Sequence, residues 1–127
     1  MKSYFLSFFA LAILLTTSCK DDDCVAGNLE TVIVGEWKVS VGVLPVGDVE
    51  FEANGDLIDP SGVLIDGEVG GGVILDHKSY NVESNSRFSV RADNGTDFVE
   101  YDIDVNEYTC DEIIMVALGT ELKLTRK

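Results

Sequence analysis

The sequence predicts an all-β fold, a small antiparallel up-and-down barrel of about eight strands. Apolar and polar residues alternate along several segments beyond residue 33, and two Asn-Gly pairs have the form of tight hairpin turns. No window after residue 20 shows a helical period. An immunoglobulin-like sandwich is the alternative architecture, but the tryptophan and the hairpin turns fit a meander better.

The first half of the predicted domain contains two strands with clear alternation. Residues 37–43 alternate apolar with polar or small side chains, and residues 49–53 do the same before the turn Asn54-Gly55. Both turn residues tolerate positive φ, which suits a hairpin. Two short apolar runs, 63–65 and 73–75, lie on either side of a glycine-rich segment and are counted as short strands.

The second half repeats the same pattern of strands joined by short turns. Asp93-Asn94-Gly95 is the second clear hairpin turn, and Gly119-Thr120 separates the last two apolar segments. Sequential hairpins of this kind favour a barrel with up-and-down connections. The predicted strands, in order, are 80–82, 88–92, 99–105, 113–118 and 121–127.

The chain begins with the features of an export signal. Lys2 precedes an apolar run from Tyr4 to Leu15, and small residues follow it. The run has about a dozen residues, whereas a membrane-spanning helix needs roughly 20. A buried helix is the alternative, but the run has no polar face. We expect residues 1–18 to be a signal peptide.

The residues around Cys19 resemble a bacterial lipobox, in which the cysteine thiol accepts diacylglycerol before cleavage. Thr17 and Ser18 are small, as the signal peptidase requires, and Leu15 lies one place before the position that usually holds leucine. The resemblance implies that Cys19 is the lipidated first residue of the mature protein. Several acyl chains hold a protein at a membrane essentially permanently.

The acidic run after Cys19 resembles the surface-export signal of lipoproteins in one Gram-negative phylum. The run consists of Lys20, Asp21, Asp22 and Asp23. The resemblance implies an outer-membrane location, facing the cell exterior. The alternative is that the like charges only keep a tether solvated beside the anchor. The expected organisation is a signal peptide over 1–18, a lipidated acidic tether over 19–31 and a barrel domain over 32–127.

The charge of the chain limits its partners. It has 9 Lys and Arg against 23 Asp and Glu, for a formal net charge of −14, and loss of Lys2 with the signal changes this to −15. Such a protein repels phosphate backbones and anionic lipid surfaces, which excludes nucleic acid as a partner. Contact with a membrane is expected only through the N-terminal lipid.

Two cysteines remain after Cys19 is assigned to the lipid. The chain is sent to an oxidising compartment, so we expect Cys24 and Cys110 to form a disulfide. The alternatives are two unpaired thiols, or a Cys24 that lies in a disordered tether.

Two ends of the predicted domain resemble the small lipocalin-like domains of bacterial lipoproteins. The segment that contains Gly35 and Trp37 is similar to their Gly-x-Trp opening, residues 51–55 to the strand and turn that follow, and residues 121–127 to their last strand. The resemblance covers roughly residues 32–127. The chain is shorter than lipocalins proper and has no helix pattern after the last strand. The resemblance implies a barrel that binds a small apolar or amphipathic ligand.

The alternation makes one structural prediction about the barrel. If the first and last strands pair, Arg126 lies over the ring of Trp37, a contact similar to one at the closed end of lipocalin-like folds. Such a cation–π contact contributes roughly 0.5–2 kcal/mol. The alternative is an Arg126 that extends from a frayed terminus.

No residue pattern in the sequence points to catalysis or to a cofactor. His77 is the only histidine, so a catalytic triad or zinc site lacks partners. Residues 102–107 begin like a calcium loop but have Glu107 where that loop needs glycine; a loose site from Asp102, Asp104 and Asp111 or Glu112 is the minority alternative. Gly67 and residues 70–72 lack the Gly-Lys-Ser or Gly-Lys-Thr of a phosphate loop and suit a flexible connection that flanks the open end.

Three functions remain open from the sequence. The first is a surface-anchored module that binds a small apolar or amphipathic ligand in the barrel mouth. The second is an interaction protein with a filled core that serves an envelope partner as accessory subunit or inhibitor. A hydrolase is the third and weakest, and we expect no enzyme. Candidate wall residues, which equally suit a packed core, are Tyr80, Phe88, Phe98, Tyr101 and Met115.

Overall fold

The computed structural model describes Cys24 and residues 27–127. The predicted signal peptide 1–18, Cys19 and the acidic run from Lys20 to Asp23 lie outside the described residues. Within the described part, no helix has the length and hydrophobicity needed to cross a membrane. The elements are α1 (Leu29–Val32), β1 (Gly35–Val41), β2 (Leu44–Phe51), β3 (Leu57–Ile58), β4 (Glu68–Val69), β5 (Val73–Ile74), β6 (His77–Ser84), β7 (Arg87–Asp93), β8 (Phe98–Tyr108), β9 (Glu112–Ala117) and β10 (Thr120–Arg126).

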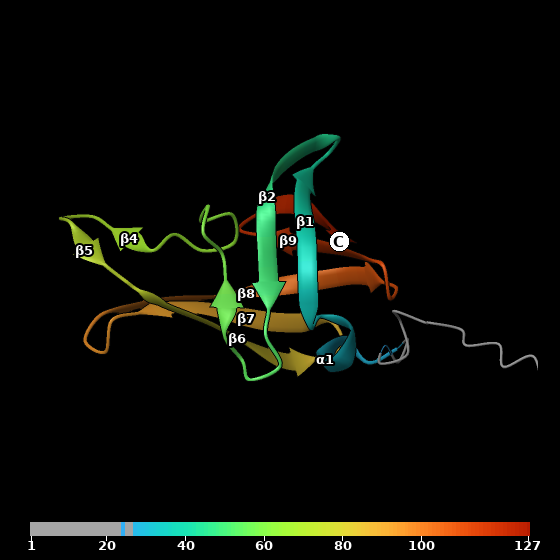
Figure 1. Cartoon of the computed structure of the whole chain (residues 1–127), viewed down its shortest axis with the longest axis horizontal. Helices are drawn as coiled ribbons and strands as arrows, with labels where there is room; N and C mark the ends of the chain where they lie inside the picture. Colours follow the sequence, from blue (N-terminus) through green and yellow to red (C-terminus); the bar gives the residue numbers. More distant parts are fainter. Residues whose placement is uncertain (1–23, 25–26) are drawn as a thin grey trace, which may run out of the picture.

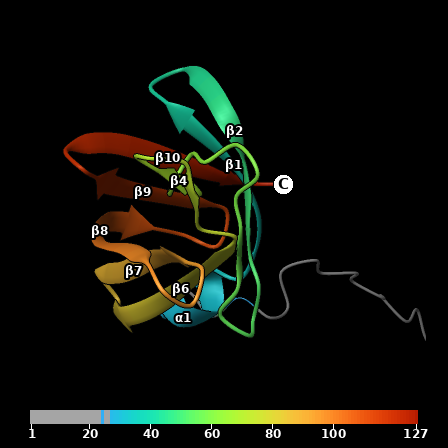
Figure 2. The same ribbon diagram turned by 90° about the vertical axis from the view of Figure 1, so that its left-hand side faces the viewer.

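Eight strands form one antiparallel sheet that curves into a nearly closed barrel, as the sequence predicts (Figure 1). The strand order is β3-β2-β1-β10-β9-β8-β7-β6, so the first long strand pairs with the last. Figure 2 shows β10, β9, β8, β7 and β6 stacked in this order, with β1 and β2 rising beside them. The remaining strands, β4 and β5, form a separate hairpin.

The barrel closes along a short seam between β3 and β6. Asp56 and Ser79 form a single bridge there, and the amide of Tyr80 donates to the carbonyl of Gly55 at 2.9 Å. The hydroxyl of Tyr80 donates to the carbonyl of Glu52 at 2.6 Å. Because β3 has only two residues, these contacts supply much of the closure.

The core lies inside the barrel and extends from Leu29 to Leu124. Phe51 lies at its centre, edge-on to the rings of Tyr80 and Phe88 at centroid distances of 4.9 and 5.7 Å. Such edge-to-face pairs add to the stabilisation from apolar burial. A chain that begins at residue 20 therefore contains every residue of the described core.

The segment predicted as a tether contains a helical turn that belongs to the folded part. In α1, Leu29 and Val32 are fully buried, and the amide of Leu29 donates to Oδ1 of Asn85 at 3.1 Å. The side chain of Asn28 caps the turn by accepting from the amide of Glu30. A single turn is too short to produce a visible helical period, so the sequence pattern missed it.

The predicted disulfide between Cys24 and Cys110 is confirmed, with a Cα–Cα distance of 5.9 Å. Cys110 lies in the turn between β8 and β9, so the disulfide ties the chain before α1 to this end of the barrel. The two cysteines are 86 residues apart, and the loop-entropy model gives such a crosslink at most about 4–5 kcal/mol.

Arg126 lies over the ring of Trp37, as expected from the pairing of the first and last strands. The two residues are direct neighbours across β1 and β10, and the guanidinium carbon is 4.1 Å from the ring centroid. The guanidinium also donates to the carbonyls of Cys110 at 2.6 Å, Val34 at 3.1 Å and Val32 at 2.6 Å. Arg126 thus joins the last strand, the disulfide-bonded turn and the residues before β1.

Gly35 is required where this arginine crosses the first strand. Its φ is +125°, and a Cβ at this position would lie 2.7 Å from Nη1 of Arg126. A side chain would therefore meet both backbone strain and a clash with the guanidinium. The Gly-x-Trp opening and the terminal arginine form one structural unit.

Arg126→Ala is expected to destabilise the barrel by about 2–4 kcal/mol, because three carbonyls lose a charged donor and Trp37 loses its cation. Urea unfolding followed by the fluorescence of Trp37, the one tryptophan, measures the change. Arg87→Ala removes an exposed pair with Asp104 and is the control, with an expected loss much smaller than that of Arg126→Ala. Equal losses in the two variants would contradict the role given to Arg126.

His77 bridges two acidic side chains at the seam. Its Nε2 lies 3.2 Å from Oδ1 of Asp56, and its Nδ1 lies 3.3 Å from Oδ2 of Asp93. The hydrogen bonds that His77 donates to Asp56 and then to Asp93 raise its pKa above the usual 6.5. The imidazole is exposed, as the sequence suggests, but it holds the end of β7 to the turn before β3.

The raised pKa of His77 makes the stability of the seam depend on pH. The protonated imidazole stabilises the folded state fully below about pH 6.5, and this contribution disappears as the pH rises through the raised folded-state pKa. Because the pair is exposed, the midpoint temperature of unfolding should fall between pH 6 and pH 8.5 by about 1–4 °C more in the wild type than in His77→Gln. Identical pH profiles by calorimetry would show that the bridge contributes nothing.

Candidate functional site

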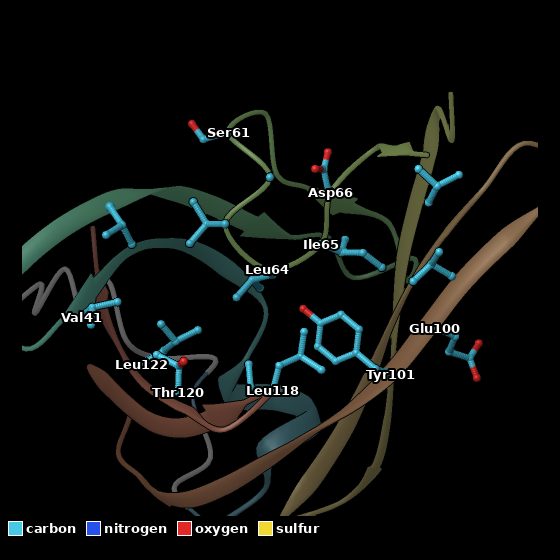
Figure 3. A pocket seen from close by; sticks show the side chains of 16 residues that line it. Val41, Ser61, Leu64, Ile65, Asp66, Glu100, Tyr101, Leu118, Thr120 and Leu122 are labelled. Carbon is cyan, nitrogen blue, oxygen red and sulfur yellow. The ribbon is translucent and has the colours of Figure 1, made fainter. Parts of the chain in front are cut away.

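A cleft of about 790 Å³ opens at the end of the barrel opposite Arg126 and the disulfide (Figure 3). Its walls come from the end of β1, the start of β2, the first residues of β8 and both sides of the β9–β10 turn, and the loop before β4 covers it. The volume lies within the range of roughly 300–1,000 Å³ that small-molecule sites occupy. The barrel is therefore filled at one end and hollowed at the other.

Large apolar side chains are exposed around this cleft. Four residues that line it are among the exposed large hydrophobics of the described chain: Val41, Val46, Val99 and Leu118. Val43 and Leu44 lie between the first two, at the tip of the β1–β2 hairpin, and are 95% and 67% exposed. An exposed apolar patch with polar surroundings is typical of a binding surface.

The loop over the cleft is held by one buried carboxylate. Asp59 is only 3% exposed. Its Oδ1 accepts from the amide of Val63 at 2.8 Å, and its Oδ2 accepts from the amides of Leu64 and Ile65, both at 2.9 Å. Three backbone donors compensate the burial of this charge. The apolar run 63–65, counted as a strand from the sequence, is therefore a loop, because its amides bond to Asp59 instead of to a neighbouring strand.

This loop lies directly against the second strand. A Cβ on Gly47 would be 2.5 Å from Cγ2 of Val63, so only glycine permits the approach. Leu64 and Ile65 are nearly fully buried and point down into the barrel (Figure 3). The loop thus lies over the mouth of the barrel, and Leu64 and Ile65 belong both to the lining of the cleft and to the core.

Leu118 has a backbone conformation that its side chain disfavours. Its φ of 49° is the one positive value at a non-glycine position in the described chain, and it is followed by Gly119 at 79°. Two successive positive φ values match the tight hairpin turn that usually holds Asn-Gly. A leucine in this region costs roughly 1–2 kcal/mol, and its side chain is 78% exposed at the cleft. Folding alone does not account for leucine here.

Tyr101 supplies the polar group inside the cleft. Its side chain extends from β8, and its hydroxyl points into the cleft below Leu64 and Ile65 (Figure 3). Among the described residues, none forms a hydrogen bond with this hydroxyl. Burial, and then the charge of Asp59, raise the pKa of Tyr101 to about 12. The hydroxyl therefore stays protonated and is free to bond to a ligand.

The other charges at the cleft are acidic and point away from its centre. Glu100 extends outward and lies 3.5 Å from Nη1 of Arg91. Asp66 accepts from the amide of Glu68 at 3.1 Å. No Lys, Arg or His lines the cleft in the described structure. The interior is thus apolar, with hydroxyl groups as its polar contacts.

Of the five candidate wall residues, Tyr101 lines the cleft and the others do not. Phe88 and Met115 are fully buried in the core. Tyr80 bonds across the seam, and Phe98 lies on the outer surface, with the guanidinium of Arg91 at 4.1 Å from its ring.

Three of the four residues considered for metal binding form ion pairs with basic side chains. Asp102 and Asp104 both pair with Arg87, at 3.9 and 2.9 Å, and Glu112 pairs with Lys123 at 3.2 Å. Within the described residues, no group of three or more His, Cys, Asp or Glu side chains is placed to hold a metal ion. The alternating acids lie on the outer face of β8.

The glycine-rich segment flanks the open end, as the sequence suggests. Gly70, Gly71 and Gly72 form the turn between β4 and β5, and the neighbouring Val69 lines the cleft. The positive φ values of Gly71 and Gly72 suit this turn.

Two residues of the site were not identified from the sequence. Asp59 begins Asp-Pro-Ser-Gly, a turn signal that places a carboxylate where it can bond to the following amides. Leu118 precedes Gly119 in a tight turn, where a large apolar residue is unusual. Both signals lie in turns, where the alternation of apolar and polar residues carries no information.

Comparison of the chain with protein-family models, curated proteins and solved structures finds no match.

Proposed function

We propose that this chain is an outer-membrane lipoprotein, anchored through Cys19 and facing the cell exterior, whose barrel binds a small apolar or amphipathic ligand in the cleft. The observation that carries the binding function is the apolar, solvent-open cleft at the mouth of an otherwise packed barrel. Burial of its exposed side chains by a ligand provides the driving force, at roughly 25 cal/mol for each Å² removed from water.

The role is one of binding without catalysis. The ionisable side chains that line the cleft are Asp66, Glu100 and Tyr101. Glu100 pairs with Arg91, Asp66 bonds to a backbone amide, and Tyr101 keeps its proton. A nucleophile next to an oriented base, which hydrolysis requires, is not formed by these groups.

Leu118→Asn tests the binding site and separates binding from stability. Asparagine tolerates positive φ, so the variant should be more stable by about 0.5–1 kcal/mol. It should bind the uncharged fluorescent probe N-phenyl-1-naphthylamine about 5–30-fold more weakly, because an apolar contact is lost. Probe titration and urea unfolding of the chain from residue 20 measure the two effects.

Ile58→Asn is the matched control for this experiment. Ile58 is 43% exposed but lies on β3, outside the cleft. The control should bind the probe as the wild type does. Unchanged binding in Leu118→Asn, or equal loss in both variants, would contradict a ligand site at the mouth.

The anchor is tested by Cys19→Ala, which should abolish incorporation of labelled fatty acid and release the protein from membranes. Cys24→Ser is the control and should keep the label, because the thiol that resembles the lipidated cysteine is Cys19. Membrane association of Cys19→Ala without label would count against lipidation.

A protein-interaction module is the second candidate. The observation that favours it is the tip of the β1–β2 hairpin, where Val43 and Leu44 project outside the cleft. Native mass spectrometry of the protein from its own host distinguishes the candidates. A co-purifying small molecule supports the ligand site, and a protein lost on Leu44→Asn supports the module.

A further inference from the structure

We infer that the cleft selects amphiphiles with an uncharged, hydroxyl-bearing head group over amphiphiles with a carboxylate head, and that the hydroxyl of Tyr101 is the polar contact for that head. This inference rests on the proposed ligand site and names its substrate class. It follows from the charges around the cleft, the position of Tyr101 and the chemistry of the other lining groups.

Recognition of a carboxylate needs a cation or several free amide donors. No basic side chain lines the described cleft. Two cations on neighbouring strands are engaged elsewhere: Nζ of Lys78 donates to the carbonyl of Asp59 at 2.5 Å, and Arg91 lies against Glu100 and Asp93. The amides of the covering loop at Val63, Leu64 and Ile65 already donate to Asp59.

The fixed charges near the cleft are negative. Asp66 and Glu100 belong to its lining, and the charge of Asp59 is felt at the hydroxyl of Tyr101. An anionic head group would face like charges and would lose its hydration without gaining a partner. The net charge of −14 adds a long-range repulsion to this local effect.

The neutral polar groups of the cleft are suited to a hydroxyl or ester. Tyr101 has a protonated hydroxyl without a partner in the described structure, and the hydroxyls of Ser61 and Thr120 belong to the same lining. Each of these groups donates and accepts hydrogen bonds. An uncharged head group can therefore form a hydrogen bond with the hydroxyl of Tyr101, while the hydrocarbon chain of the same ligand covers the apolar wall that includes Val46 and Leu118.

The experiment compares amphiphiles that have hydrocarbon chains of the same carbon number and different head groups. The chain from residue 20 is loaded with N-phenyl-1-naphthylamine at pH 8, and the probe is displaced with 1-monolauroylglycerol, dodecanoate or dodecyltrimethylammonium below their micelle concentrations. We expect monolauroylglycerol to displace the probe at a concentration at least about tenfold below dodecanoate. The cationic compound shows whether the acidic surroundings alone set the preference.

Tyr101→Phe tests the residue assigned to the head group. It should weaken the binding of monolauroylglycerol by about 3–10-fold more than it weakens the binding of the probe, because one hydrogen bond to the head group is lost, and leave the urea midpoint unchanged. Ser79→Ala, on the seam and outside the cleft, is the control for removal of a hydroxyl. It should leave the affinities for the probe and for monolauroylglycerol unchanged.

The outcomes separate this inference from the proposed function. Displacement by dodecanoate at the same or a lower concentration than monolauroylglycerol would overturn the head-group preference while leaving a ligand site. Displacement by dodecyltrimethylammonium at a lower concentration than by monolauroylglycerol would overturn the preference for a hydroxyl-bearing head group. An unchanged affinity of Tyr101→Phe for monolauroylglycerol would overturn the assignment of Tyr101 as the contact for that head group. Failure of the probe itself to bind the wild type would overturn the proposed function.

Discussion

The antiparallel pairing of β1 with β10 is the contact on which the rest of the structure depends, because it joins the first and last strands of a curved sheet. Arg126 secures this pairing with three hydrogen bonds and its contact with Trp37. The same pairing brings the β1–β2 hairpin beside the β9–β10 turn at the far end of the barrel, where both line the cleft. The geometry of the mouth thus depends on a strand pairing that Arg126 stabilises at the other end.

The sequence predicted the features that depend on local pattern or on pairing of the ends: the alternating strands, the disulfide and the contact between Arg126 and Trp37. Alternation tells whether a side chain faces into the barrel, but it does not tell how deep along the axis the residue lies. Tyr101 and Phe88 both face inward, yet one lines the cleft and the other is core. The loop at Val63–Ile65 was mispredicted because its amides bond to a side chain, Asp59, that pattern analysis does not consider.

The two ends of the barrel are built on opposite physical principles. At the closed end, backbone carbonyls and a guanidinium satisfy one another around a buried tryptophan. At the mouth, apolar side chains remain in water and Leu118 keeps a disfavoured backbone conformation. Departures from optimal folding that gather at one place are characteristic of functional sites. Here they gather around a cleft whose cover is fixed by Asp59.

The disulfide between Cys24 and Cys110 also determines how a lipidated chain would stand on its membrane. Cys24 follows Cys19 by five residues, and a segment of this length spans at most about 18 Å when fully extended. Because Cys110 lies at the closed end, a lipid on Cys19 would hold that end near the membrane, with the cleft at the opposite end of the barrel. Without the crosslink, the attachment would move to α1, which lies at the same end because the carbonyl of Val32 accepts from Arg126. In the proposed lipoprotein the crosslink would therefore shorten the connection between the anchor and the closed end as well as stabilise the barrel.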